Sequence, residues 1–553
     1  MIRRRSLVRS CVLACLLALP NCSYAQEGQA KPSPTPAQTP EPGKSGAAYE
    51  FRATTRLVIL DLVATDAAGR TVPDLRPEEV HVFENGKEQT KRDFSFLQAT
   101  PENAGERVEL HLPPDVFTNV PQYKGNTSFN IILFDVLNTS FPNMAYAHDQ
   151  VIKYLDSTPP NQPTAIYALG SKLWMLHDFT TDHEALKEVM RKFKGQGSKL
   201  VVTSPDENKA YQHKSTFTTM GVDHAVATLE AFRSLARVMA GYKGRKNLIW
   251  ISESFVVDTM PDIQAPRGPF FLDNYSRFVE QTSDAMMEAQ IAIYAIDAGA
   301  LSGETFRPML NRFSAQSSLR EMAERTGGKA FMRRNDLDLG IRSSIDDGSS
   351  YYTTSYSPSN KTWDGRLRKI EVKTSRPGVK LRYRQGYFAS VEPSAAPATK
   401  EDTKEASIDF AQALDPDLPL ATGLIFQAQV VPPSEKTNNK VLINFALDPH
   451  LIAFSAREDG LHHAEVSCIA WAFPVKGKPI GSGGSTIKAA VDTPTFNKLM
   501  QANVPCRQTL DLQPGNYMLR LGVIDQMTRH IGALTAWVTV PGEEPAAASV
   551  AKP

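Results

Sequence analysis

The chain has 553 residues, of which 41% are hydrophobic and 22% charged, and its formal net charge is +1 at pH 7. Because this charge is close to zero, the chain has no broad electrostatic attraction to nucleic acid or anionic lipid, and neither is expected as a partner. The length predicts three or four domains, and the hydrophobic content is sufficient for packed cores.

Residues 1–25 are predicted to be a cleavable secretory signal peptide. Four arginines and no acid accompany the apolar run CVLACLLAL of residues 11–19, and Ser23 and Ala25 are small residues at the two positions that a signal peptidase recognises. The apolar run is far shorter than the roughly 20 residues that span a bilayer. The alternative is a lipoprotein with Cys22 as the lipid acceptor. The sequence therefore predicts an exported protein, periplasmic, at the cell surface or secreted, without a transmembrane segment.

Removal of the signal peptide changes the charge and the cysteine count. Four arginines are lost, so the formal net charge falls from +1 to −3, and only Cys468 and Cys506 remain of the five cysteines. So few cysteines argue against a disulfide scaffold or a zinc ribbon. An exported pair in one domain forms a disulfide only if the two sulfurs meet, and the sequence leaves that open.

Three stretches have compositions typical of disordered chain. Residues 26–48 are rich in Pro, Ala and Gly and have no apolar period, so they are predicted to form an extended tether. Residues 391–415 are predicted to be a second linker, and residues 542–553 a disordered tail. The stretches predicted to fold are 50–98, 125–390 and 416–541.

The first folding stretch, residues 50–98, is predicted to be a small β module. RLVILDLVATD is strand-like, and VHVFENGKEQ has the pattern of a hairpin. Asn85-Gly86 between its two arms favours a tight turn of the primed type.

The second stretch, residues 125–390, alternates buried strands with amphipathic helices. FNIILFDV, NLIWIS and IAIYAID are continuous apolar runs, as expected of strands buried on both faces. Residues 221–242 have the apolar period of a helix. The alternation predicts a doubly wound α/β domain, a parallel sheet with helices on both faces. Three strand-like runs within residues 349–390 predict a β extension of this domain.

The third stretch, residues 416–541, consists of strand-like runs and turns, including LIFQAQVV, KVLINFAL and GNYMLRLGVID. Its size and turn spacing predict a C-terminal β-sandwich. The fold class expected for the whole chain is therefore multidomain, α/β plus all-β.

The motifs between about residue 55 and residue 390 resemble a known family. They are LVILDLVATDAAGRTVPDLRPEEVHVFENGKEQ, FNIILFDVLNTS, HDFTTDHEAL, GRKNLIWISES, AERTGGKAF, YYTTSYSP, DGRLRKIEVKT and YRQGYFA. In order and spacing they resemble the von Willebrand factor type A-related domain proteins of acidobacterial genomes. The resemblance implies a type A fold, which agrees with the α/β pattern. It also implies a binding module, often one that uses a divalent cation, and implies little about activity.

The resemblance further implies where a cation would lie. Type A domains place it at the carboxyl ends of the central strands, where open α/β sheets hold ligands. The site combines an Asp-x-Ser-x-Ser loop, a threonine from a second loop and an acid from a third. Mg²⁺ prefers oxygen ligands in near-octahedral geometry, and a carboxylate, two hydroxyls and waters satisfy it. A carboxylate of the partner then completes the ligand shell.

Carried over residue by residue, the metal ligands would be Asp135, Thr139, Thr218 and Glu253. Asp135 ends the first buried strand, and Thr139 falls at the second hydroxyl position of its loop. The threonine of the second loop is Thr218 or Thr219, just before the long helix. Glu253 is the acid of the third loop.

Two positions depart from the family pattern. Leu137 stands at the first hydroxyl position and has no ligand atom, and Glu253 is longer than the usual aspartate. Both changes weaken a site for Mg²⁺ or Mn²⁺, because Mg²⁺ tolerates distortion poorly. Two interpretations follow: an altered metal site that captures an acidic group, or a degenerate site in which Asp135 caps a neighbouring helix or hydrogen-bonds loop amides.

The sequence contains no nucleophile elbow, no His-Glu-x-x-His motif and no phosphate-binding loop. A non-enzymatic function is therefore expected, namely binding or adhesion to a protein or cell-envelope macromolecule through the loop end of the central sheet. The alternatives are a metal-free structural or assembly component of the cell envelope and a hydrolase of envelope polymers.

Overall fold

The computed structural model describes residues 57–99, 107–123, 128–157, 162–170, 172–193, 217–255, 269–299, 306–389, 400–457, 459–474 and 479–541. The predicted signal peptide, the tether of residues 26–48 and the tail of residues 542–553 lie outside these ranges.

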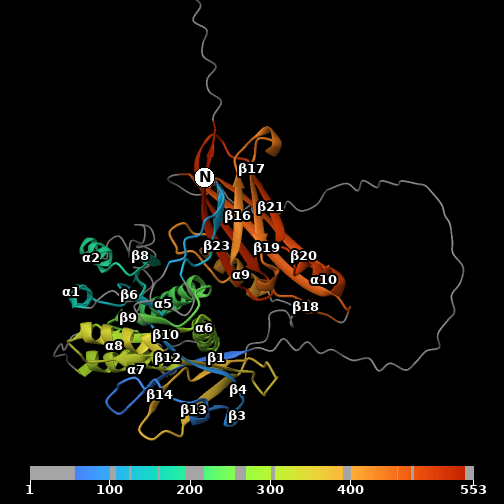
Figure 1. Ribbon diagram of the computed structural model, residues 1–553. Helices are drawn as coiled ribbons and strands as arrows, with labels where there is room; N and C mark the ends of the chain where they lie inside the picture. Colours follow the sequence, from blue (N-terminus) through green and yellow to red (C-terminus); the bar gives the residue numbers. More distant parts are fainter. Residues whose placement is uncertain are drawn as a thin grey trace, which may run out of the picture. The chain divides into compact units, whose positions relative to one another are not determined.

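A six-stranded sheet forms the centre of the α/β part of the chain, with strand order β11-β10-β9-β6-β7-β8 (Figure 1). The strands are β6 (Phe129–Asp135), β7 (Thr164–Leu169), β8 (Leu173–Thr180), β9 (Lys246–Ser252), β10 (Ile291–Asp297) and β11 (Lys329–Phe331). All neighbours run parallel except β8, which is antiparallel to β7. The prediction of a parallel sheet is confirmed, whereas β8 adds a reversed end strand that the apolar pattern did not indicate.

Helices cover both faces of this sheet, which is why β6, β9 and β10 are buried at every position. In β6, Ile131 and Leu133 pack into the core on one face, and Ile132 and Phe134 pack into the core on the other. This alternation follows from the two-residue period of a strand.

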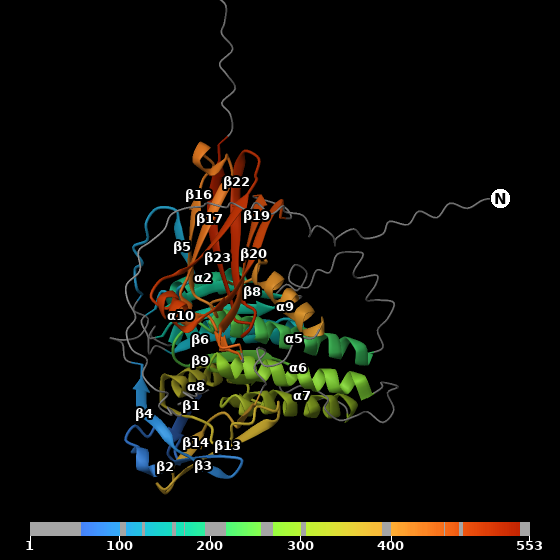
Figure 2. The same ribbon diagram turned by 90° about the vertical axis from the view of Figure 1, so that its right-hand side faces the viewer.

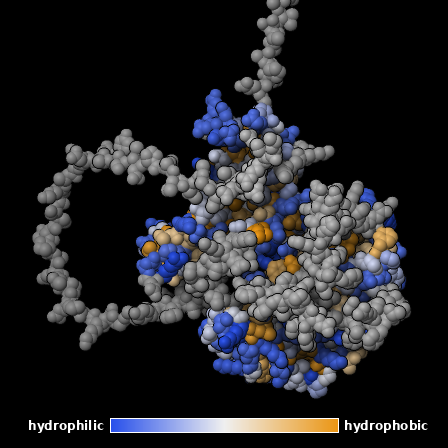
Figure 3. Space-filling model, turned by 180° about the vertical axis from the view of Figure 1, so that it is seen from behind, coloured by the Kyte–Doolittle hydropathy of each residue, from blue (hydrophilic) through white to orange (hydrophobic). Residues whose placement is uncertain are grey.

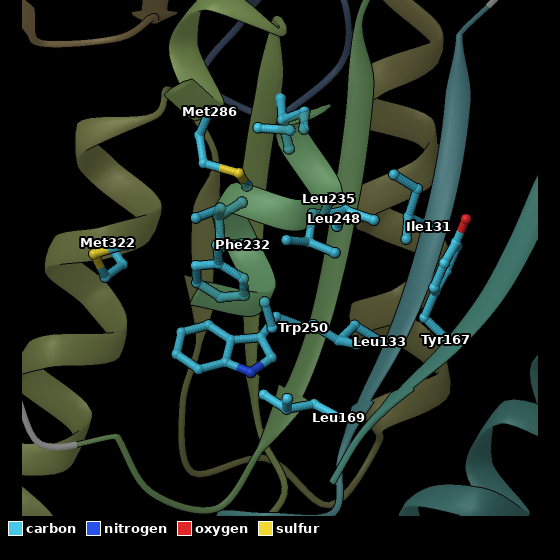
Figure 4. Packing of buried hydrophobic residues seen from close by; sticks show 14 of the residues in the cluster. Ile131, Leu133, Tyr167, Leu169, Phe232, Leu235, Leu248, Trp250, Met286 and Met322 are labelled. Carbon is cyan, nitrogen blue, oxygen red and sulfur yellow. The ribbon is translucent and has the colours of Figure 1, made fainter. Parts of the chain in front are cut away.

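Helices among the described residues supply the two layers of this α/β part. They are α1 (Phe141–Ser157), α2 (His183–Lys192), α5 (Phe217–Met239), α6 (Pro269–Glu288), α7 (Phe306–Arg325) and α8 (Leu337–Ser349). Buried side chains of α5, α6 and α7 belong to one core, and those of α1, α2 and α8 to the other. Figure 2 shows α5 and α6 side by side. In the first core, Phe232 of α5 packs edge-on against Trp250 of β9, with ring centroids 5.0 Å apart (Figure 4).

Two four-stranded sheets combine strands from before and after the α/β part. Their orders are β14-β1-β12-β4 and β15-β13-β2-β3. The strands are β1 (Val58–Thr65), β2 (Val80–Glu84), β3 (Lys87–Gln89), β4 (Lys91–Gln98), β12 (Ser350–Tyr356), β13 (Leu367–Thr374), β14 (Lys380–Arg382) and β15 (Gly386–Phe388). The strands of residues 350–388, expected as a β extension of the α/β domain, therefore pair with those of residues 58–98.

One hydrophobic core joins these two sheets. It includes Leu60 and Val82 from the first stretch and Tyr352 and Ile370 from the later one. The turn between β2 and β3 is Asn85–Gly86, with φ values of 48° and 81°. Two consecutive positive φ values define the primed turn that the sequence predicts.

The C-terminal strands form two antiparallel sheets around a single core. The orders are β21-β17-β16-β5 and β18-β19-β22-β23, and β20 pairs with β19. The strands are β5 (Val116–Thr118), β16 (Phe426–Val431), β17 (Val441–Leu447), β18 (Ser455–Ala456), β19 (His462–Pro474), β20 (Gly481–Val491), β21 (Val504–Leu510), β22 (Gly515–Asp525) and β23 (Ile531–Val540). A short helix, α10 (Thr493–Leu499), joins β20 to β21.

Two elements around the C-terminal sheets differ from the sequence analysis. β5 comes from the weakly patterned chain before the α/β part, yet it pairs with β16. Helix α9 (Lys400–Ala413) lies where residues 391–415 are predicted to be a linker. Phe410 and the following Leu414 pack against Ile524 and Ala533, so this helix contributes to the C-terminal core. In the part of the chain that the structure describes, the helices lack the combination of length and hydropathy needed to cross a membrane.

Candidate functional site

The strand order of the central sheet reverses between β6 and β9. β6 is the first strand of this sheet along the chain and β9 the fourth, and they lie side by side in parallel register. In open α/β sheets, ligands bind at the carboxyl ends of the strands at such a switch point. The last residues of these two strands are Asp135 and Ser252.

The carboxylate of Asp135 is buried and accepts hydrogen bonds from three other residues. Oδ1 accepts from the backbone N–H of Asn138 and from its Nδ2, each at 3.0 Å. Oδ2 accepts from Asn138 Nδ2 at 2.9 Å, from Trp250 Nε1 at 3.0 Å and from Ser252 Oγ at 2.8 Å. A carboxylate has about four lone-pair positions, and these donors occupy them.

Burial raises the pKa of Asp135 to about 6, while the hydrogen bonds from Asn138, Ser252 and Trp250 act in the opposite direction. The donors therefore offset only part of the cost of placing the carboxylate away from water.

The side-chain amide of Asn138 connects the loop after β6 to helix α5. Its Nδ2 also donates to Thr228 Oγ1 at 2.9 Å, and Thr228 in turn donates to the backbone oxygen of His224 at 2.9 Å. Thr228 is completely buried. Thr228 was not expected as part of the site. Thr228 lies within the predicted helix of residues 221–242, but its position along the helix gives no sign of the contact.

Thr139 and Glu253 join the loops that follow β6 and β9. The backbone N–H of Glu253 donates to Thr139 Oγ1 at 3.1 Å, and Glu253 Oε2 accepts from the backbone N–H of Ser140 at 2.7 Å. The structure thus brings Asp135, Thr139 and Glu253 to one edge of the sheet. The carboxylate of Glu253 is directed to Ser140, the residue just before α1, and Leu137 packs against the core.

The remaining ligand expected from the resemblance is Thr218. It lies in α5, as does its alternative Thr219, and both side chains fall outside the described residues.

These contacts do not fit a bound Mg²⁺ or Mn²⁺. A cation needs free oxygen lone pairs, but those of Asp135 accept from N–H and O–H donors. The amide nitrogen of Asn138 is a donor and cannot act as a ligand. Within the described ranges, no group of three or more His, Cys, Asp or Glu side chains is arranged to hold a metal ion.

A further strand-end acid at this edge, Asp297, is also satisfied internally. Its Oδ1 accepts from the backbone N–H of Gly299 at 2.9 Å, and its Oδ2 accepts from Gln316 Nε2 at 2.6 Å. Asp297 is buried, so these bonds hold the end of β10 against α7.

Strand order, two helix layers and a buried acid at the switch point define a doubly wound α/β protein with accompanying β sheets. No protein-family model matches the chain, and no curated protein matches it.

Several solved structures show a distant likeness. An aerotolerance-related membrane protein from Bacteroides fragilis is 12% identical, with 40% of this chain and 98% of that chain covered and a TM-score of 0.23. A von Willebrand factor type A protein from Catenulispora acidiphila is 10% identical over 82% of this chain and 75% of that chain, with a TM-score of 0.22. A manganese-loaded TRAP protein from Plasmodium vivax is 8% identical over 49% of this chain and 95% of that chain, with a TM-score of 0.25. Such low scores assign neither family nor function, so the fold rests on the strand order itself.

Proposed function

We propose that this protein is an exported, non-enzymatic binding protein of the von Willebrand factor type A-related kind found in acidobacterial genomes. Its α/β part docks a protein or cell-envelope macromolecule at the switch-point edge, and it does so without a metal ion. The observation that supports this most directly is the set of donors around Asp135. Asn138, Trp250 and Ser252 occupy the carboxylate that a divalent cation would need.

The same hydrogen bonds favour a preorganised docking loop. Asn138, Thr139 and Ser140 are tied to β6 and to the segment after β9, so the loop has little conformational freedom left to lose. A binding surface ordered in advance costs less entropy when a partner binds.

Phe141 is the side chain at this edge best suited to anchor a partner. It is the first residue of α1 and is 60% exposed. Figure 3 shows one face of the molecule, on which the coloured hydrophobic residues form small groups between hydrophilic ones. Single exposed hydrophobic residues are normal on protein surfaces. Phe141 differs because it follows the ordered loop, where an aromatic ring can fill a pocket of the partner.

A metal-free structural or assembly component of the cell envelope is a second candidate function. The occupied carboxylate of Asp135 supports it equally, because neither function requires a cation. The two differ in whether the switch-point edge contacts a separable partner.

The test is capture of partners from the native envelope fraction by the immobilised protein, with and without EDTA. Wild type and Phe141→Ala are compared with Trp537→Ala, which removes an aromatic side chain of similar exposure, 63%, on β23. We expect wild type and the Trp537 variant to retain the same partner in EDTA, and the Phe141 variant to lose it. Equal retention by the Phe141 variant, or loss of the partner in EDTA, would refute the proposal.

A further inference from the structure

A cleft of about 550 Å³ lies away from the switch point, beside the last strand of the central sheet. Its walls come from α7, the turn Gly327–Gly328, β11, β13 and β14. Lys329, which begins β11, is in register with Tyr294 in the middle of β10. Through β9 this position is level with Ile132 of β6, so the start of β11 is three strands and three residues from Asp135, roughly 17 Å by ordinary strand spacings.

The glycine turn allows the two walls of the cleft to approach closely. Gly327 has a φ of 79°, and a Cβ at this position would lie 2.7 Å from the backbone nitrogen of Arg384. A Cβ on Gly328 would lie 1.9 Å from the backbone oxygen of Ile293. Only glycine fits at either position, so at this turn the backbone of Gly327 and Gly328 lies directly against the backbone of Arg384 and Ile293.

Cationic side chains outnumber acidic ones in the cleft. The charged residues that line it are Arg320, Glu324, Lys329, Lys369, Glu371 and Arg382. Of these, Glu371 is paired with Lys373 at 3.3 Å, and Arg382 is paired with Asp347 at 2.8 Å.

Three of the cations have no acidic partner among the described residues: Arg320, Lys329 and Lys369. Lys369 lies on β13, where the side chains of alternate residues are exposed, and Lys329 is exposed on β11. Two acids line the cleft. Glu371 has Lys373 as its partner, whereas Glu324 on α7 has no cationic partner among the described residues. The cleft therefore has an excess of positive charge that an anionic ligand can neutralise.

Two terminal strands contribute to the walls of the cleft. β11 ends the six-stranded sheet, and β14 ends the sheet that contains β1. The outer edge of a terminal strand offers backbone N–H and C=O groups to which an extended chain can add. A peptide can use these groups and the cations together, whereas a phosphate or a sugar cannot continue the strand ladder.

We propose that this cleft binds an extended acidic peptide segment of a partner protein. Its main chain pairs with a terminal strand, and its carboxylates pair with Arg320, Lys329 and Lys369. The volume of the cleft falls within the range of about 300–1,000 Å³ that is usual for ligand sites. This site is separate from the switch-point edge and does not depend on the function proposed for that edge.

The test is fluorescence anisotropy with a labelled oligoglutamate peptide on the full exported chain. The variant is Lys329→Glu with Lys369→Glu, and the matched control is Lys361→Glu with Lys498→Glu, two exposed lysines that neither line the cleft nor lie on β11 or β14. We expect saturable binding to wild type and control, and affinity weaker by about tenfold or more in the cleft variant. Amide hydrogen exchange in β11 or β14 should slow in the complex.

Three results would overturn the proposal: no saturable binding to wild type, equal loss in the control variant, or equal binding of a linear polyphosphate of the same charge. The last result would show that charge alone decides binding and that strand pairing contributes nothing. Partner capture that depends on Phe141 is measured separately, so the failure of one proposal does not imply failure of the other.

Discussion

Trp250 donates its indole Nε1–H to Oδ2 of Asp135 across 3.0 Å. The indole ring is completely buried and packs edge-on against Phe232 and Phe255, with centroids 5.0 Å away in each case. The core thus fixes a hydrogen-bond donor at the carboxylate that ends β6. Trp250, on β9, therefore supplies one of the hydrogen bonds that the carboxylate of Asp135 accepts. This N–H group occupies a lone pair that a bound cation would need.

Replacing Asp135 with alanine should destabilise the protein strongly. Trp250 Nε1, Ser252 Oγ and the backbone N–H of Asn138 would lose their acceptor, and a buried unsatisfied polar group costs about 1–3 kcal/mol. We expect the free energy of unfolding of the α/β part to fall by about 3 kcal/mol or more, measured by chemical denaturation. Asp149→Ala, which removes an exposed carboxylate on α1, should change it little.

The same proteins test the metal-free interpretation of Asp135. Mg²⁺ or Mn²⁺ should leave the melting temperature of wild type and of Asp135→Ala unchanged, because the lone pairs of the carboxylate are already occupied. Calorimetric titration should show no uptake by either protein. Stabilisation of wild type alone by Mg²⁺ would contradict this interpretation.

The stability of the protein should also depend on the protonation of Asp135. Burial raises its pKa to about 6, above the value of about 4 in an unfolded chain. The folded protein therefore holds this proton more tightly, so the stabilising contribution is fully present below about pH 4 and is lost as pH rises through about 6. We expect the stability of wild type relative to Asp135→Asn to fall by about 1.4 kcal/mol per pH unit within that window. Denaturation of both proteins at a series of pH values checks this, and a constant difference would contradict it.

The sequence predicted the central strands and the position of Asp135, but not the contacts around it. Runs such as residues 248–251 are apolar throughout, and this local property is sufficient to indicate a buried strand. Asn138 and Thr228 meet across 90 positions of sequence, and their hydrogen bond depends on how α5 packs. The residues around Asn138 in the sequence give no indication that Thr228 lies next to it.

The sequence likewise did not predict which distant segments would pair as strands. β5 is three residues long and pairs with β16, some 300 residues later, so its own composition gives no signal. Helix α9 was missed because charged residues surround its apolar positions, Ala406, Phe410 and Ala413, although their spacing is helical.

The residue after β5 gives a direct test of how strongly this strand is held. Asn119 Nδ2 donates to the backbone oxygens of Ala421 and Leu424 at 3.2 and 2.9 Å, and Asn119 Oδ1 accepts from the backbone N–H of Phe426 at 2.9 Å. Asn119→Ala removes this partner from the backbone oxygen of Leu424 and the backbone N–H of Phe426, whereas the oxygen of Ala421 still accepts from Ala533 N–H. The substitution should lower the stability of the C-terminal sheets by about 3 kcal/mol, measured by calorimetry. Asn444→Ala, which alters an exposed amide on β17, is the control. Equal melting of both variants would show that β5 contributes little.

Cys468 and Cys506 make the last prediction. Both thiols are free and buried, and the interaction between them shifts the pKa of each. The interaction with Cys468 lowers the pKa of Cys506 to about 6, while burial and the same interaction raise the pKa of Cys468, so Cys506 is the more readily ionised of the two thiols. With glutathione disulfide, the Cys506 thiolate forms a mixed disulfide and releases one glutathione thiol. Cys468 then displaces the second glutathione and closes the protein disulfide.

The closed Cys468–Cys506 disulfide should stabilise the C-terminal sheets. It would join β19 to β21, which belong to different sheets, and its loop contains about 37 residues. Closing such a loop restricts the unfolded chain and is worth about 4 kcal/mol. We expect oxidation to be slow, because both sulfurs are buried, and to raise the melting temperature of wild type but not of Cys468→Ala. Thiol labelling after unfolding counts the remaining free sulfurs. Two free thiols after prolonged oxidation, with no change in melting, would show that the sheets hold the sulfurs in contact without allowing a bond.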